Sequence, residues 1–251
     1  MPEAEATIND LFTFNEDEDV VVLEDEDVVE LHCINEMQEG ATLGDIYIGK
    51  VKNIVGNIGS AFIEIANGVE CYYSLDENES PIFTNKMGKK PLCIGDELIV
   101  QVSKEAVKTK VPTVTSKISF TGKYAVLTSG DTRIGASTKL PKNEKDRLIS
   151  IAEQYASDKY GFILRTNSKD VSEDVLKAEI ENLIREYERL VGNAKMRVCF
   201  SCLKKSPKQY LVELKNIYQE GLSDIIVEDV GLYSEVKECL ENNQPEDLEK
   251  P

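Results

Sequence analysis

The sequence lacks both features that direct a chain to a membrane. No apolar run in its 251 residues approaches the roughly 20 residues that a membrane-spanning helix needs. The first residues are acidic, whereas a secretory signal begins with positive charge and continues into an apolar stretch. We therefore expect a cytoplasmic protein with no membrane association.

Metal-binding side chains of the usual kinds are also scarce. His32 is the only histidine, and the six cysteines contain a single CxxC pair, Cys199 and Cys202. A structural zinc site needs about four such ligands, and a chain without a secretory signal keeps its thiols reduced. We interpret the pair as buried residues of a strand over 197–203, because the surrounding residues are β-rich; a zinc-binding pair is the alternative.

Positive charge is missing from the first 30 residues, which hold twelve Asp or Glu and no Lys or Arg. The net charge of −17 argues against nucleic acid, because phosphate binding needs basic side chains. Residues 86–123 differ, since eight lysines stand against three acidic residues, a local charge of +5. These lysines form either a solvated surface or a phosphate-binding one. They are Lys86, Lys89, Lys90, Lys104, Lys108, Lys110, Lys117 and Lys123.

A hydrophobic content of 41% is sufficient for ordinary cores, and the length suits two or three small domains. Residues 1–19 offer few anchors, so we expect them to be disordered. From Val20 to Leu31, two apolar runs flank an acidic turn and predict a short hairpin. A lone hairpin is unstable in water, so it must pair with a later part of the chain.

Residues 41–117 contain five short β-rich runs separated by glycine turns, a pattern typical of a small barrel or sandwich. The runs cover 45–51, 60–65, 71–75, 97–102 and 111–119.

Helices and strands alternate in the remainder. Pro141 opens a helix whose apolar face holds Leu148, Ile151, Ala152 and Tyr155, and Ser172 is the expected N-cap of a longer one. Strands are expected at 124–127 and 162–166, followed by strand 197–203, helix 206–220, strand 224–228 and helix 231–241. The last four elements predict a parallel strand pair covered by helices.

The β-rich region resembles an S1 domain over residues 44–51, 59–63, 72–75 and 94–100. Single-stranded RNA is bound by aromatic side chains on which bases stack and by cations that follow the phosphates. Phe62 and Tyr72 are the candidate aromatics. The alternative is that Phe62 fills the barrel interior. The candidate cations are Lys104, Lys108 and Lys110.

The resemblance extends to the ribonuclease E/G family over residues 101–105, Thr115, Ile118, 122–127 and 161–166. It implies an α+β multidomain chain, in which an S1-type OB β-barrel is inserted in a split RNase H-like α/β domain and a small α/β 5′-sensor subdomain follows. The implied divisions are 1–40 and 196–251 for the two RNase H-like halves, 41–117 for S1 and 118–195 for the sensor.

The resemblance also implies site residues. Phe62 and Tyr72 fall at the family's RNA-stacking positions, where Tyr72 replaces a more usual Phe, and Lys110 falls at a basic RNA contact. Those implied to bind a 5′-monophosphate are Gly122, Val126, Arg165 and Thr166. The Arg guanidinium suits phosphate oxygens and Thr adds a hydroxyl. Without the resemblance, Arg165 would be read as a surface cation paired with a carboxylate.

The family's nuclease chemistry uses Mg²⁺ held by aspartates in a DNase I-like segment, and a cysteine motif further on binds zinc and joins subunits. The sequence stops at Pro251 before these motifs. We therefore expect no catalytic residue and no cofactor in this chain, with Mg²⁺ and a homo-oligomer belonging to a full-length form.

The resemblance thus implies the RNA-binding portion of an endoribonuclease, which binds single-stranded RNA, senses a 5′-monophosphate and does not cleave unaided. One alternative is a non-catalytic S1 adaptor or regulator. A weaker one is a metal nuclease built on Glu24–Asp27 or on Glu228 and Asp229, although solvated acidic turns explain these residues more simply.

Overall fold

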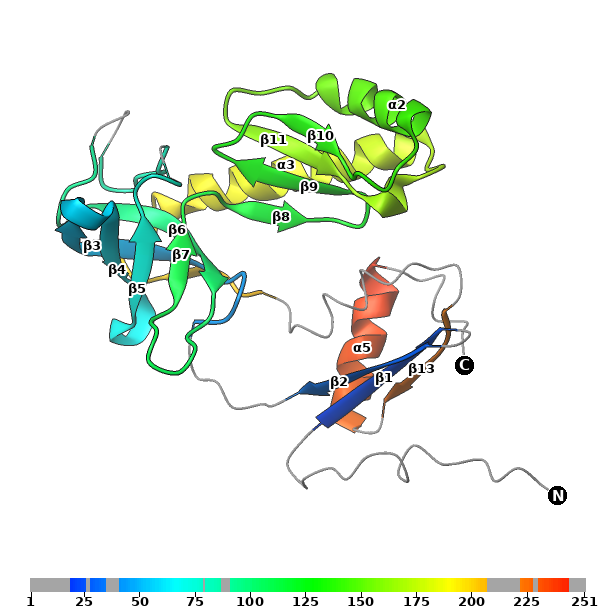
Figure 1. The fold of residues 1–251 in the computed structure, drawn as a ribbon, viewed down its shortest axis with the longest axis horizontal. Helices are drawn as coiled ribbons and strands as arrows, with labels where there is room; N and C mark the ends of the chain where they lie inside the picture. Colours follow the sequence, from blue (N-terminus) through cyan, green and yellow to red (C-terminus); the bar gives the residue numbers. More distant parts are fainter. Residues whose placement is uncertain are drawn as a thin grey trace. The chain divides into compact units, whose positions relative to one another are not determined.

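The computed structural model describes residues 19–25, 28–34, 41–78, 80–86, 91–206, 222–227 and 230–243. The chain divides into two compact units, Met1–Glu39 with Pro207–Pro251, and Gly40–Ser206; each is considered by itself (Figure 1). Some expectations from the sequence concern residues outside this set. They are those for residues 1–18, for the helix expected at 206–220 after Ser206, and for Lys89 and Lys90.

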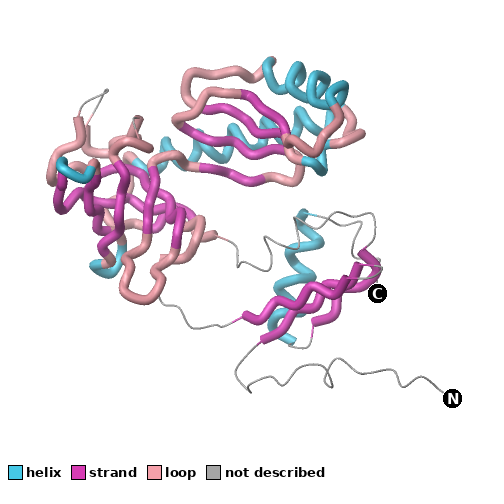
Figure 2. The backbone as a smooth tube through the Cα atoms, in the orientation of Figure 1, coloured by secondary structure: helices cyan, strands magenta, loops and turns pink. Residues whose placement is uncertain are grey.

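Among the described residues of the larger unit, five strands form a closed barrel. They are β3 (Ile46–Val55), β4 (Ser60–Glu64), β5 (Glu70–Ser74), β6 (Glu97–Lys104) and β7 (Thr113–Thr115). The order is β3-β4-β5-β7-β6, β6 pairs back onto β3, and only the β5–β7 pairing in the barrel is parallel. This strand order is that of an OB barrel, and Figure 2 shows the strands wrapped around one another. The expected barrel is confirmed.

Strand alternation separates two cores at the barrel wall. Tyr47 on β3 and Leu98 on β6 face the barrel interior, whereas Ile48 and Ile99 face a second core shared with helix α3 (Glu173–Ala194). Because successive side chains of a strand point to opposite faces, this wall is buried on both sides. The barrel and the following α/β layer therefore pack as one unit.

That α/β layer is a four-stranded sheet in the order β10-β11-β9-β8. The strands are β8 (Ser119–Thr121), β9 (Ala125–Ser129), β10 (Ile134–Ala136) and β11 (Tyr160–Leu164), and α2 spans Lys142–Glu153. Phe120, Leu127 and Phe162 pack on the face covered by α2 and α3. Ser172 caps α3 as predicted, since its side chain accepts from Val175 N.

The expected strand 111–119 is interrupted by a turn. Ile118 N donates to Ser116 O and to Ser129 Oγ, so the chain leaves the barrel after β7 and enters the sheet as β8. Tyr155, expected on the helix face, lies beyond the end of α2 and packs beside the core. The first difference reflects the contact of Ile118 with Ser129 of β9.

The smaller unit contains β1 (Asp19–Asp25), β2 (Val28–Ile34), β13 (Leu222–Val227) and α5 (Val230–Asn243). β1 pairs antiparallel with both β2 and β13, in the order β13-β1-β2, and α5 lies against β13. The predictions that the first hairpin pairs with a later segment and that a helix covers 231–241 are confirmed.

The predicted parallel pair is wrong. β12 (Cys202–Lys204) pairs antiparallel with β3 of the barrel, and β13 pairs antiparallel with β1. The strand predicted over 197–203 is also too long, because Phe200 has φ of 69°, a left-handed conformation that a strand does not contain. Cys199 lies in this turn and Cys202 is exposed in β12, so the pair is not a pair of buried strand residues.

A buried carboxylate fastens the chain after β12 to the barrel. Asp45 is fully buried and bonds Lys205 Nζ at 2.8 Å, Tyr47 OH at 2.9 Å and Ser206 N at 2.8 Å. Gly44 has φ of +88°, and a Cβ there would lie 2.7 Å from Ser206 Oγ. The two segments, 160 residues apart in sequence, therefore form one fixed contact.

We predict that the larger unit loses stability at alkaline pH. Burial raises the pKa of Cys71 from 9.0 to about 12 and that of Tyr73 from 10.0 to about 12; burial and the Asp45 carboxylate do the same for Tyr47. A group with a raised folded pKa stabilises fully below its unfolded pKa, and that stability is lost as pH rises toward the folded value. The affected window is about pH 9 to 12.

At pH 10, one unit above its unfolded pKa, Cys71 alone accounts for about 1.4 kcal/mol. Thermal melts followed by circular dichroism between pH 8 and 10.5 should show a falling Tm, and the fall should be smaller in Cys71→Ala. An unchanged Tm across this range would contradict the assignment.

Candidate functional site

A row of side chains crosses the outer face of the barrel. Phe62 on β4 lies opposite Tyr72 on β5, and Thr113 on β7 lies beside both Tyr72 and Lys104. The intervening residues, such as Ile63 and Tyr73, are buried in the barrel interior. Because paired residues of adjacent strands share a face, the row faces outward. We call these residues, Phe62, Tyr72, Thr113 and Lys104, the barrel row.

The two aromatic rings of the barrel row touch edge to face. Their centroids lie 6.4 Å apart with an interplanar angle of 83°, and Ser60 Oγ donates to the Tyr72 hydroxyl at 2.9 Å. Both side chains are half-buried. Phe62 therefore does not fill the barrel interior, and the alternative interpretation of it is wrong.

Lysines of the barrel row and of the β6–β7 loop carry unneutralised charge. Lys104, Lys108 and Lys110 are exposed, and within the described part of the chain their side chains have no ion pair. Lys110 lies in the β6–β7 loop, which is closed by backbone bonds between Val107 and Lys110. The lysines of residues 86–123 are not all unpaired. Lys86 forms an ion pair with Asp96, and its Nζ lies 4.0 Å from the centre of the Phe83 ring.

Two residues of this face were missed from the sequence. Thr113 joins Tyr72 to Lys104, and Asn53 on β3 lies opposite Phe62 and is exposed. Only the register between strands places them there, and neither residue type is distinctive. An assumed OB strand order would have been needed to find them.

A second group of predicted residues gathers at one end of the α/β sheet. Arg165 follows β11, and its Nη1 donates to the Gly122 carbonyl at 2.8 Å. Burial lowers the pKa of Arg165, while the nearby Glu179 carboxylate opposes that change. Thr166 begins a 3-10 turn, and its hydroxyl lies 3.0 Å from Ser137 Oγ. Arg165 is thus half-buried and bonded to backbone, in contrast to an ordinary surface cation.

Val126 is placed differently from the other three. It lies on β9 opposite Ile163 and Thr121, on the sheet face away from the helices. Gly122 follows β8, whereas Arg165 and Thr166 follow β11, and the structure places these three residues at the same end of the sheet. Val126 lies on β9, the strand between β8 and β11.

Glu179 on α3 completes this group and was missed from the sequence. Its Oε1 accepts from Tyr124 N at 2.7 Å and from Ala125 N at 2.8 Å, and its Oε2 accepts from Lys123 N at 3.1 Å. The sequence showed only one glutamate among many on an amphipathic helix. Nothing local distinguished it.

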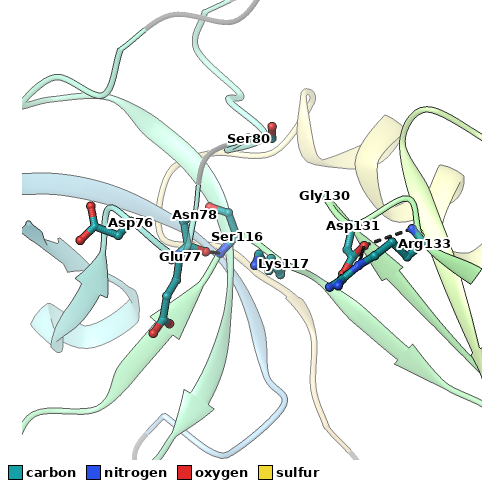
Figure 3. A pocket seen from close by; sticks show the side chains of 9 residues that line it. All are labelled: Asp76, Glu77, Asn78, Ser80, Ser116, Lys117, Gly130, Asp131 and Arg133. Carbon is teal, nitrogen blue, oxygen red and sulfur yellow. Dashed lines mark hydrogen bonds and ion pairs between the residues drawn. The ribbon is translucent and has the colours of Figure 1, made fainter. Parts of the chain in front are cut away.

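A polar pocket of about 230 Å³ lies where the barrel meets the sheet. Figure 3 shows Lys117 between Asn78 and Ser116 on one side and the Asp131–Arg133 pair on the other. Arg133 holds the pKa of Asp131 down to about 2. None of the predicted site residues lines this pocket.

No metal cluster is present among the described residues, where no three His, Cys, Asp or Glu side chains lie in a group able to hold an ion. The four cysteines whose side chains are described, Cys71, Cys93, Cys199 and Cys202, are free thiols. Glu24–Asp27, Glu228 and Asp229 lie wholly or partly outside the residues whose side chains are described. No helix in the described part is long and apolar enough to cross a membrane.

The fold and this arrangement define an OB-like barrel protein with an attached α/β sheet. The sequence model of the Ribonuclease E/G family matches residues 119–250, more than half of the chain. The chain belongs to the ribonuclease E/G family, as its motifs indicated.

Curated relatives agree. Ribonuclease E of Synechocystis sp. is 26% identical over 233 residues, covering 89% of this chain and 35% of the relative. Ribonuclease G of Haemophilus influenzae is 26% identical over 228 residues, covering 86% and 46%. Ribonuclease G of Escherichia coli K12 is 25% identical over 177 residues, covering 66% and 36%. The chain thus spans between a third and a half of these relatives.

Proposed function

We propose that this chain is the RNA-binding portion of a ribonuclease E/G family endoribonuclease, and that its barrel is an S1 domain that binds single-stranded RNA. The barrel row carries this proposal, because it presents two aromatics and a lysine on one outward face of an OB-like barrel. Each base stacked on an aromatic contributes about 1 to 3 kcal/mol. Lys104, Lys108 and Lys110 supply the local positive charge that the whole chain lacks.

Screening by salt allows an acidic protein to bind a polyanion through a local basic face. Charges farther apart than about 8 Å are largely screened at physiological salt. RNA on the barrel therefore interacts chiefly with the charges of that face, and acidic residues farther away than this distance contribute little.

Binding should be measured by fluorescence anisotropy with the full chain and a labelled single-stranded RNA, against the same RNA annealed to its complement. We expect tighter binding to the single strand, because only unpaired bases can stack on Phe62 and Tyr72. Affinity should also fall with salt. Equal or tighter binding to the duplex would contradict the proposal.

We further propose that Gly122, Val126, Arg165 and Thr166 bind a 5′-monophosphate on the same RNA. The half-buried guanidinium of Arg165, bonded to the Gly122 carbonyl, supports this role, since a partly desolvated Arg binds phosphate oxygens more strongly than an exposed one.

We predict that Arg165→Ala removes the preference for 5′-monophosphorylated over 5′-hydroxyl RNA. A hydrogen bond to a charged group is worth about 1.5 to 3 kcal/mol, so the affinity ratio should fall about tenfold or more. Arg189→Ala, on the exposed surface of α3, is the matched control. If the Arg165 variant keeps the wild-type ratio, a non-catalytic S1 adaptor becomes the better description.

The remaining assignments are part of the same proposal. Residues 1–40 and 196–251 would be halves of a split RNase H-like domain, 41–117 the S1 domain and 118–195 the 5′ sensor. The pairing of β1 with β13 supports the first of these, although β12 belongs to the barrel sheet, which moves the second half to after Ser206.

Cleavage and Mg²⁺ use are proposed for the family's nuclease segment, not for the residues described above. The chain incubated with 5′-monophosphorylated RNA and Mg²⁺ should bind the RNA and leave it intact. Specific cleavage, abolished by EDTA, would favour a metal nuclease within this chain instead.

A further inference from the structure

The turn that joins β8 to β9 is held by a side chain from another element. Glu179 of α3 accepts from the backbone N–H groups of Lys123, Tyr124 and Ala125, at 2.7 to 3.1 Å. These three residues are half-buried or buried, and an unpaired amide in such a place is costly. One carboxylate therefore satisfies three donors that the turn leaves without a strand partner.

The same carboxylate explains the glycine at the start of the turn. A Cβ on Gly122 would lie 2.6 Å from Glu179 Oε1 and 3.1 Å from Ala125 O. Any other residue would push the carboxylate away from its donors. Gly122 is thus required by Glu179, rather than by φ, which is not positive there.

The 122–125 turn also positions Arg165. Its carbonyl at Gly122 accepts from Arg165 Nη1 at 2.8 Å, and Tyr124 O accepts from Arg165 N at 2.7 Å. Both acceptors belong to the segment that Glu179 holds. The negative charge of Glu179 also favours the charged form of the half-buried Arg165 guanidinium.

We infer that Glu179 is the positioning residue of the 5′-phosphate site, acting through the 122–125 turn to aim the Arg165 guanidinium. This inference rests on the proposed 5′-phosphate function. The carboxylate is fully engaged with backbone donors, and a negative charge next to a phosphate would repel it if it touched the ligand directly. Glu179 therefore acts on the phosphate only through Arg165.

A second description is possible, in which the carboxylate occupies the place of the phosphate and is displaced by it. The two descriptions predict opposite changes in the affinity for 5′-monophosphorylated RNA when Glu179 is replaced. Removal of a competitor strengthens binding of 5′-monophosphorylated RNA, whereas removal of a positioning group weakens it. The contacts of Arg165 with Gly122 and Tyr124 favour positioning, because they already hold the Arg165 side chain and backbone while Glu179 is in place.

The test compares affinities for two RNAs of one sequence, with a 5′-monophosphate or a 5′-hydroxyl, in the wild type and in Glu179→Ala, Glu179→Gln, Arg165→Ala and Glu188→Ala. Glu188 is an exposed control on the same helix. In Glu179→Gln the amide oxygen can still accept the two bonds that Oε1 accepts now. Amide hydrogen exchange at Lys123, Tyr124 and Ala125 reports the turn itself.

We expect Glu179→Ala to lower the affinity ratio as far as Arg165→Ala does, by about tenfold or more, with fast exchange at the three amides. The affinity ratio of Glu179→Gln should lie between those of Glu179→Ala and the wild type, and the ratio of Glu188→Ala should equal that of the wild type. All variants should bind 5′-hydroxyl RNA with the same affinity. This graded order would not result from general destabilisation, which weakens both RNAs together.

Three results overturn the inference. A wild-type ratio in Glu179→Ala, with a lowered ratio in Arg165→Ala, leaves the 5′-phosphate function standing and removes Glu179 from it. A raised ratio in Glu179→Ala identifies a competitor instead. If the wild type itself does not distinguish the two RNAs, the proposed 5′-phosphate function fails, and the role of Glu179 in it fails too.

Discussion

Replacing Phe62 and Tyr72 together by alanine is expected to weaken binding of single-stranded RNA by about 10²-fold. Two stacked bases at about 1 to 3 kcal/mol each would lose about 2 to 6 kcal/mol, or roughly 30-fold to 10⁴-fold in affinity. The rings touch each other, and losses at neighbouring residues that touch do not simply add. We therefore place the expected value toward the low end of this range.

The variants can be chosen to separate stacking from folding. Tyr72→Phe removes only the hydroxyl that accepts from Ser60 and should bind RNA nearly as well as the wild type. Ile94→Ala removes an apolar side chain that is 65% exposed and lies outside the barrel row. Anisotropy titrations of these three variants, with melts to confirm folding, test the row. Binding of the double variant within threefold of the wild type would remove RNA stacking from this face.

Lys205→Met is expected to destabilise the larger unit by about 3 kcal/mol, the lower end for breaking a buried ion pair. The cost arises at Asp45, which is fully buried, and not at Lys205, whose side chain is 64% exposed. Tyr47 and Ser206 continue to donate to the carboxylate, but its charge loses its cation. The methionine keeps most of the lysine stem, so lost packing contributes little.

Urea unfolding followed by circular dichroism measures this effect. Lys195→Met, an exposed lysine just after α3, is the matched control and should change stability by less than about 0.5 kcal/mol. Adding Asp45→Asn to Lys205→Met removes the buried charge and should restore part of the loss. With Asp45→Asn measured alone, the cycle gives the coupling between the two residues. A loss below about 0.5 kcal/mol in Lys205→Met would show that the two hydrogen bonds alone suffice for Asp45.

The barrel and the described helices were predictable because their signals are local. Glycine turns between short β-rich runs mark the barrel strands, and apolar residues at spacings of three and four with Ser172 as N-cap mark α3. The parallel pair failed for a nonlocal reason. An alternation of strands and helices does not state which sheet each strand joins, and β12 pairs with β3 of the barrel, next to the Asp45–Lys205 contact.

The sequence by itself determined the family and the OB-like barrel, and it marked Phe62, Tyr72 and Arg165 as candidates, because each depends on motifs or periodicities within short segments. Tertiary structure alone decided which face Phe62 occupies, that Thr113 and Asn53 lie beside the aromatics, and that Glu179 holds the turn beside Arg165. These facts depend on strand register and on contacts between residues more than 50 positions apart. A linear sequence specifies such contacts only through the whole fold.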